Sequence, residues 1–258
     1  MNEQLSWRRI GWLLRNDFVA SYRSWLTASA VIAGIMLLAA LLGANQGEGE
    51  TYLGWFIGTL LIWGTIMSSL SFTELHDKSK NIAYLTLPAS ALEKTIAPLL
   101  VSTVGLIAYL LVFMTLVSVA IEAINVAVVA GRHEPFDPFS PWVWSVIPHY
   151  IVLQALFFAG GAWFRRARYL MTGLALLAIC FGLWVVLAFA LWLTGAVQIV
   201  GAGIDIQADI GFWFEQADGR LVAALEVLFK IAYFAVLPLF CWYLAWLRLT
   251  ETEVSHGV

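Results

Sequence analysis

The sequence predicts an all-α membrane protein with six transmembrane helices and both termini in the cytoplasm. Hydrophobic residues make up 61% of the 258-residue chain and charged residues only 12%, which is about half the charged share of a soluble domain. Six stretches reach the roughly 20 apolar residues that a helix needs to cross a bilayer. Lys and Arg fall mostly on one side of those stretches. We therefore expect a multi-pass protein of the bacterial inner membrane, with no soluble domain and no nucleic-acid partner.

The segment 1–23 is polar, basic and aromatic, so we expect no cleavable signal peptide there. Its apolar residues recur at helical spacing on one face: Trp7, Ile10, Leu14, Phe18 and Tyr22. We interpret the segment as an amphipathic helix on the membrane surface, with Trp7, Arg8 and Arg15 at the lipid headgroups. The alternative is a simple cytoplasmic extension of the first span.

The transmembrane domain, 24–258, contains the six predicted spans. They cover roughly 24–43, 52–72, 96–120, 143–164, 170–195 and 226–247. The fourth is the weakest, because Pro148, His149 and Gln154 interrupt it, whereas the fifth carries no charge from Leu170 to Thr194. The fourth span is required if both termini lie in the cytoplasm, because only an even number of spans returns the chain to its starting side.

Positive charge gives the orientation. Eleven of the fourteen Lys and Arg lie on one side: Arg8, Arg9, Arg15, Arg23, Lys78, Lys80, Lys94, Arg165, Arg166, Arg168 and Arg248. The opposite segments hold Arg132 and Arg220 and are acidic, and Lys230 lies early in the last span. The excess of positive charge on the cytoplasmic side of membrane proteins places both termini in the cytoplasm.

The outer stretch 196–225 mixes glycines, Ile and aromatic residues with four acids. We expect a re-entrant or interfacial helix before the last span; the alternative is an ordinary extracellular loop. Glu226 and Lys230 then follow at a spacing that permits an intrahelical ion pair. The favoured interpretation is that this pair reaches the interface, and the alternative is a substrate contact.

The cytoplasmic loop 73–94 is the most informative part of the sequence. It carries Leu85 and Leu87 amid charged residues, which predicts a surface that docks on lipid or on another protein. Ser90 and Glu93 have the spacing of a capping box, so a helix should start after Ser90. Pro88 disfavours helix just before that start, and together these residues predict a fixed hinge between the loop and the third span.

The loop resembles that of permease subunits in the type-2 ABC-transporter family of exporters. The matching residues are Phe72, Glu74, Leu75, Lys78, Lys80, Tyr84, Leu85, Leu87, Pro88, Ser90, Glu93 and Lys94. The resemblance implies a coupling helix between the second and third spans that seats in a groove of a separate cytoplasmic ATPase. It implies contacts to that ATPase from Glu74, Leu75, Asp77, Lys78, Tyr84, Leu85 and Leu87. It also implies a second permease, either another copy or a paired chain, because six spans are half of the usual core.

The chain lacks the phosphate-binding pattern Gly-x-x-x-x-Gly-Lys-Ser/Thr. We therefore expect ATP and Mg on the partner ATPase, and no cofactor on this chain. Its His residues are scattered and show no metal-binding spacing, so we expect no metal site. Cys180 and Cys241 lie in apolar runs and should act as small apolar side chains. Glu122 and His149 could meet, but we expect both to be solvated near the membrane edge, and no enzymatic activity.

Two other functions stay open from the sequence. An ion- or proton-coupled secondary transporter usually has buried charges at the centres of its spans and related halves, and neither is visible here. A non-transporting membrane anchor could use the loop 73–94 to recruit a cytoplasmic protein. The predicted function is the membrane half of an exporter that a separate ATPase drives.

Overall fold

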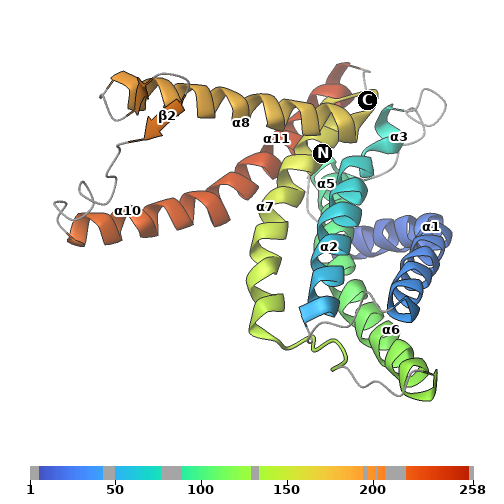
Figure 1. Ribbon diagram of the computed structural model, residues 1–258. Coiled ribbons are helices and arrows are strands. Elements are labelled where there is room, and N and C mark those ends of the chain that lie inside the picture. Colours follow the sequence, from blue (N-terminus) through green and yellow to red (C-terminus); the bar gives the residue numbers. More distant parts are fainter. Residues whose placement is uncertain are drawn as a thin grey trace.

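The computed structural model describes residues 6–42, 50–76, 89–128, 134–193, 197–200, 203–206 and 219–255. Apart from one short hairpin, the elements in these ranges are helices. They are α1 (Trp7–Leu41), α2 (Glu50–Leu70), α3 (Thr73–His76), α5 (Ala91–Leu100), η1 (Val101–Gly105), α6 (Leu106–Val128), α7 (Pro141–Trp163), α8 (Arg168–Leu193), β1 (Val197–Val200), β2 (Gly203–Ile206), α10 (Gly219–Ile231), η2 (Ala232–Val236) and α11 (Leu237–Ser255). Figure 1 shows α2, α6 and α7 as a bundle, from which α8 and α10 extend to one side.

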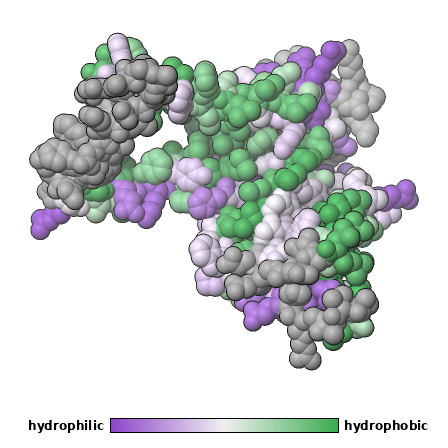
Figure 2. All heavy atoms as spheres, in the orientation of Figure 1, coloured by the Kyte–Doolittle hydropathy of each residue, from purple (hydrophilic) through white to green (hydrophobic). Residues whose placement is uncertain are grey.

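Six helical segments are long and apolar enough to cross a membrane, which confirms the predicted number of spans. They are Ser21–Leu41, Thr51–Leu70, Ala91–Ala127, Pro141–Trp163, Arg168–Ala190 and Val222–Thr252. Figure 2 shows that most of the visible helix surface is apolar. A surface of this kind is stable against hydrocarbon and unstable in water, so the chain is a multi-pass membrane protein.

The third and sixth spans extend beyond both predicted ends, and each contains a π-helical turn. In the third span, Pro98 lies one turn before η1 (Val101–Gly105). In the sixth, η2 (Ala232–Val236) ends just before Pro238. A proline ring crowds the carbonyl four residues earlier and offers no N–H to it. For Pro238 that carbonyl belongs to Phe234 in η2, where the wider turn relieves both problems; for Pro98 it belongs to Lys94, ahead of η1. The prolines therefore modify these spans without ending them.

The fourth span, the weakest in sequence, is the most buried of the six. Its helix α7 packs against α2, α8 and α11. Gln154 is fully buried: its Nε2 donates to Ser102 Oγ (3.0 Å) and its Oε1 accepts from Trp242 Nε1 (3.3 Å). The polar residue that weakens the hydropathy signal thus joins α7 to two neighbouring helices.

Aromatic rings fill the core between α1, α2 and α6. Trp25 lies edge-on to Trp63 and to Tyr109, with ring centroids 5.8 and 5.0 Å apart. Trp63 and Tyr109 are themselves in edge contact at 5.9 Å. Edge-to-face packing of this kind adds roughly 0.5–1.5 kcal/mol per pair beyond area burial, so these rings fix α1 to the bundle.

The N-terminal segment is helical from Trp7, as predicted, and continues without interruption into the first span. Figure 1 shows that α1 changes direction along its length. Along the predicted apolar face, Ile10 is buried, whereas Trp7 and Phe18 are exposed. Only part of that face therefore packs against the rest of the protein.

The expected interfacial helix over the start of 196–225 is wrong. Residues Val197–Val200 and Gly203–Ile206 form an antiparallel hairpin, with Val197 opposite Ile206, and the next described helix, α10, begins at Gly219. Val and Ile occupy three of the four positions of β1 and two of the four positions of β2, and β-branched side chains favour extended backbone. The glycines at 201 and 203 suit a tight connection between strands. Residues 207–218 lie outside the described part of the chain.

Candidate functional site

The two ends of the segment 73–94 lie within the described residues, and its middle does not. Glu74 and Leu75 belong to α3, and Ser90 and Glu93 mark the start of α5. The remaining predicted contact and hinge residues lie outside the described residues: Asp77, Lys78, Tyr84, Leu85, Leu87 and Pro88. We call the end of the bundle that contains α3, the start of α5 and the end of α7 the loop end.

The first end of the segment is anchored by apolar packing. Phe72 and Leu75 are buried in a cluster with Phe158 of α7 and Leu249 of α11. The Phe72 and Phe158 rings are in edge contact, with centroids 4.9 Å apart. Leu75 was predicted to contact the partner, but it is 5% exposed, so it holds α3 in place and offers little surface. Glu74, by contrast, is exposed.

Two polar contacts add to this anchor. His76 Nε2 lies 3.2 Å from the carbonyl oxygen of Gly161 at the end of α7. Arg168 Nη1, at the start of α8, donates to Thr73 Oγ1 at 2.8 Å. Burial lowers the pKa of His76, and the positive charges of Arg168 and Arg165 lower it further. His76 is therefore neutral at physiological pH and donates to the Gly161 carbonyl as the Nε2–H tautomer.

The close approach of α7 to α2 at this point depends on glycine. A Cβ on Gly161 would lie 2.6 Å from the backbone oxygen of Ser69 in α2. A backbone atom within a helix cannot move aside cheaply. Gly161 thus lets α7 pack directly on the turn that leads into α3.

The second end of the segment is a capping box, as predicted. Ser90 Oγ accepts from the Glu93 backbone N–H at 3.3 Å, and Glu93 Oε2 accepts from the Ser90 N–H at 3.1 Å. Both bonds satisfy N–H groups that the first turn of a helix leaves without partners. The start of α5 is consequently fixed.

Glu93 has a second role that the sequence did not reveal. Its other oxygen, Oε1, accepts from the backbone N–H of Ser6 (2.7 Å) and from Arg9 Nη2 (3.0 Å) and Nε (3.2 Å). The Glu93 side chain is fully buried, while that of Arg9 is 46% exposed. One carboxylate thus caps α5 and holds the start of α1. Arg9 and Glu93 are 84 residues apart, and no pattern in the sequence predicts that they lie in contact.

The residues predicted to lie at the membrane surface, Trp7, Arg8 and Arg15, are exposed on the first turns of α1. Arg15 lies over the ring of Trp12, 5.6 Å from its centroid. These positions leave the three side chains accessible, and their contact with lipid stays a prediction.

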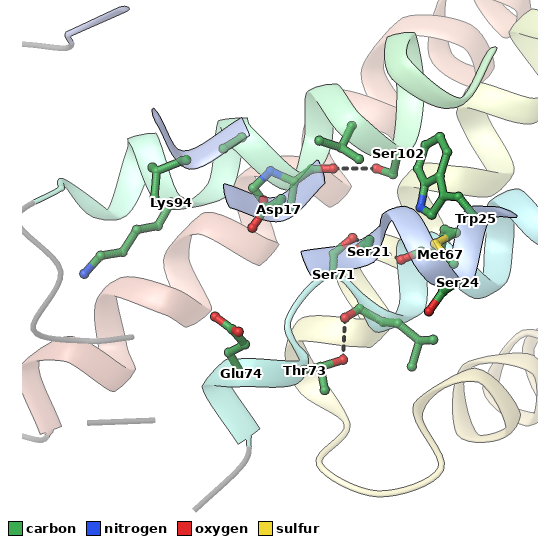
Figure 3. A pocket seen from close by; sticks show the side chains of 15 residues that line it. Asp17, Ser21, Ser24, Trp25, Met67, Ser71, Thr73, Glu74, Lys94 and Ser102 are labelled. Carbon is green, nitrogen blue, oxygen red and sulfur yellow. Dashed lines mark hydrogen bonds between the residues drawn. The ribbon is translucent and has the colours of Figure 1, made fainter. Parts of the chain in front are cut away.

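A cleft of about 320 Å³ opens beside these anchors, between α1, the end of α2 with α3, and α5. Figure 3 shows Asp17, Glu74 and Lys94 together on one side, with Trp25, Met67 and Ser102 on the other. Burial raises the pKa of Asp17 to about 6, and the negative charge of Glu74 contributes to that rise. No sequence pattern indicated this cleft, because its three walls come from separate parts of the chain.

At the opposite end of the bundle, Glu122 and His149 do not meet. Glu122 Oε1 accepts from Tyr52 Oη at 2.6 Å and lies 3.5 Å from Asn125 Nδ2. His149 faces the ring of Phe234, with centroids 5.1 Å apart. Glu122 is 9% exposed, so the expectation of a solvated carboxylate is wrong, because Tyr52 and Asn125 supply hydrogen bonds within the bundle.

The ion pair expected in the sixth span is present: Lys230 Nζ lies 2.6 Å from Glu226 Oε1, and both side chains are exposed. Cys180 is exposed and Cys241 is buried, and both are free thiols. Across the described ranges, no group of three or more His, Cys, Asp or Glu residues is placed to hold a metal ion.

Comparison with known proteins gives no relative. No protein-family model, no curated protein and no solved structure matches this chain.

Proposed function

We propose that this chain is the membrane-spanning permease subunit of an exporter driven by a separate ATPase, as its resemblance to type-2 ABC-transporter permeases implies. In this proposal the loop end faces the cytoplasm. The segment 73–94 forms the coupling element on which the ATPase docks. A second permease completes the transport path, and ATP and Mg are bound by the partner.

The observation that carries the proposal is the double anchoring of this segment. Its start is held by packing against α7 and α11 and by the bond from Arg168 of α8 to Thr73. Its end is held by the Ser90–Glu93 capping box and by the contacts of Glu93 with Ser6 and Arg9 of α1. A displacement of the segment would reach α7 and α11 through buried apolar contacts, α1 through the buried carboxylate of Glu93, and α8 through the exposed Arg168–Thr73 bond. Such rigid, packed connections are what transmission from a docked ATPase requires.

Charge supports the same orientation. The ends of α1 and α11 that approach this segment belong to the side with eleven of the fourteen Lys and Arg, which the positive-inside rule assigns to the cytoplasm. The chain has no phosphate-binding loop of its own, so energy from ATP has to come from a partner that docks on this side.

The test is purification of the tagged chain from its native membranes, followed by identification of what accompanies it. We expect an ATPase to copurify with the natural sequence and to be lost when Leu85 and Leu87 are both replaced by Asp. Leu42→Asp is the matched control, because Leu42 is 77% exposed and lies at the far end of α1. Membrane fractionation of each variant reports insertion.

Undiminished ATPase on the Leu85→Asp/Leu87→Asp variant would refute the docking assignment. Transport that an ionophore abolishes, and that an inactive ATPase leaves intact, would favour a secondary transporter. A partner without ATPase activity, lost in the double variant alone, would favour a membrane anchor.

A further inference from the structure

The cleft beside the anchors lies at the ends of three spans. Asp17 precedes the first span, which begins at Ser21, and Glu74 follows the second, which ends at Leu70. Trp25 and Met67 line the cleft from positions inside those spans, and Lys94 lines it from the start of the third. The cleft is therefore charged where the spans end and largely apolar where they enter the membrane.

The charged side chains in the lining come from three elements: Asp17 of α1, Glu74 of α3 and Lys94 of α5. With both carboxylates ionised, the lining carries a net charge of −1. Figure 3 shows the carboxylates of Asp17 and Glu74 on the same side of the cleft. Asp17 is half-buried and Glu74 is exposed. Because a half-buried carboxylate beside a second negative charge is unfavourable in its ionised form, a cation beside Asp17 and Glu74 would be stabilised.

The apolar wall of the cleft contains a buried hydrogen-bond donor without a partner in the described part of the chain. Trp25 is 5% exposed, and its Nε1 has no hydrogen-bond partner among the described residues. Figure 3 shows its indole nitrogen on the edge of the ring turned toward the other lining residues. A buried N–H without an acceptor is unfavourable by about 1–3 kcal/mol, so an acceptor on a bound molecule would relieve this deficit.

We propose that this cleft binds a cationic amphiphile, with its ammonium group between Asp17 and Glu74, an acceptor oxygen toward Trp25 and its apolar tail along Met67 and the membrane. The volume of about 320 Å³ falls at the lower end of small-molecule sites, which suits a headgroup whose tail stays in lipid. The cationic amphiphile would be a substrate of the proposed exporter, and its role as a substrate rests on the proposed function. Binding itself requires no ATPase.

Protonation of Asp17 also competes with binding of the cation. Burial and Glu74 raise the pKa of Asp17 to about 6, whereas an ammonium ion beside it favours the ionised form. Protonation of Asp17 removes one of the two carboxylates that the cation needs. Lowering the pH from 7.5 to 5 should therefore weaken binding of a permanently charged cation about tenfold.

The experiment uses the purified chain alone in a non-ionic maltoside detergent, with empty micelles as background. Radiolabelled lauroylcholine is the probe, because its quaternary charge is independent of pH and its ester supplies an acceptor. N-lauroyltaurate, with the same tail and an anionic head, is the control ligand. Dodecyltrimethylammonium, which lacks the acceptor, isolates the part played by Trp25.

We expect saturable binding of lauroylcholine at pH 7.5, no saturable binding of N-lauroyltaurate, and an affinity about tenfold lower at pH 5. Asp17→Asn should weaken lauroylcholine binding at least tenfold and remove its pH dependence, and Glu74→Gln should also weaken it. Glu226→Gln, at an exposed carboxylate outside the cleft lining, should change nothing. Trp25→Phe should remove the preference for lauroylcholine over dodecyltrimethylammonium. A thermal unfolding curve for each variant shows that the protein is folded.

Equal binding of the cationic and anionic probes, or full affinity in folded Asp17→Asn and Glu74→Gln variants, would overturn the proposal. Its failure is distinguishable from failure of the proposed function. Cation binding without a copurifying ATPase would leave the cleft assignment standing and remove the exporter. A copurifying ATPase with no saturable cation binding would remove the cleft assignment alone.

Discussion

Replacement of Glu93 by Gln tests the connection between α1 and α5. The substitution keeps the size of a fully buried side chain but removes its charge. One oxygen can still accept from Ser6 and Arg9, while an NH₂ group now faces the Ser90 N–H in place of Oε2. We expect the start of α5 to lose one of the two hydrogen bonds of its capping box and the start of α1 to lose its ion pair.

The magnitude follows from these contacts. The bond from the Glu93 backbone N–H to Ser90 Oγ survives the substitution, so the loss at the capping box is the Ser90 N–H left without an acceptor, about 1–2 kcal/mol. Because the Arg9 side chain is 46% exposed, its ion pair with Glu93 is partly screened and contributes only about 0.5–1 kcal/mol. Glu93→Gln should therefore lower the free energy of unfolding by about 1.5–3 kcal/mol.

The assay is reversible unfolding of the purified protein in mixed micelles with increasing SDS. Glu251→Gln is the matched control, because its side chain is 62% exposed and pairs with Arg248 across one helical turn. A pair of that kind contributes about 0.2–0.5 kcal/mol. In a double-mutant cycle, combining Arg9→Ala with Glu93→Gln should cost less than the sum of the two single substitutions. If Glu93→Gln costs no more than Glu251→Gln, the reasoning about Glu93 is refuted.

Three further predictions concern other contacts. Gly161→Ala should destabilise the protein by about 1–3 kcal/mol, since its Cβ would lie 2.6 Å from the backbone of α2; Gly173→Ala, with open space around it, should have no such effect in the same unfolding assay. Tyr150→Phe removes the hydroxyl that donates to a carbonyl of η1 and should cost about 1 kcal/mol, and an unchanged unfolding midpoint would contradict this. For Asp17 the folded-state pKa of about 6 lies above the ordinary value of 3.8, so ionisation opposes folding; the penalty is absent below pH 4 and complete above about pH 6. Asp17→Asn should thus raise stability at pH 7.5 by about 2–3 kcal/mol and leave it unchanged at pH 4, as unfolding curves at both pH values would show.

The sequence predicts those features that depend on composition or short spacing. Hydropathy alone locates all six spans, because length and apolar content are local properties of the chain. The capping box of Ser90 and Glu93 and the Glu226–Lys230 pair follow from spacings of three and four residues. Each of these features lies within a single helix or at its end.

The features that the sequence does not predict join distant segments. Arg9 and Glu93, Thr73 and Arg168, and the walls of the cleft meet only after the helices pack. Gln154 weakens the hydropathy signal of the fourth span, because the sequence does not show that its hydrogen-bond partners lie on other helices. The hairpin at 197–206 depends on local composition instead: β-branched residues favour extended backbone and glycines favour a tight turn, whereas apolar content alone also fits an interfacial helix.

Site-specific photo-crosslinking tests the central proposal most directly. A photoreactive amino acid at position 85, in native membranes, should form an adduct with a cytoplasmic protein that contains a phosphate-binding loop. The same group at position 184 is the control, because Trp184 is 63% exposed in the uncharged middle of α8 and should react with lipid or another permease. An ATPase adduct from position 85 and none from position 184 is the predicted result. Adducts of position 85 with lipid alone, or with the ATPase equally from both positions, would contradict the proposal that this segment couples the permease to its ATPase.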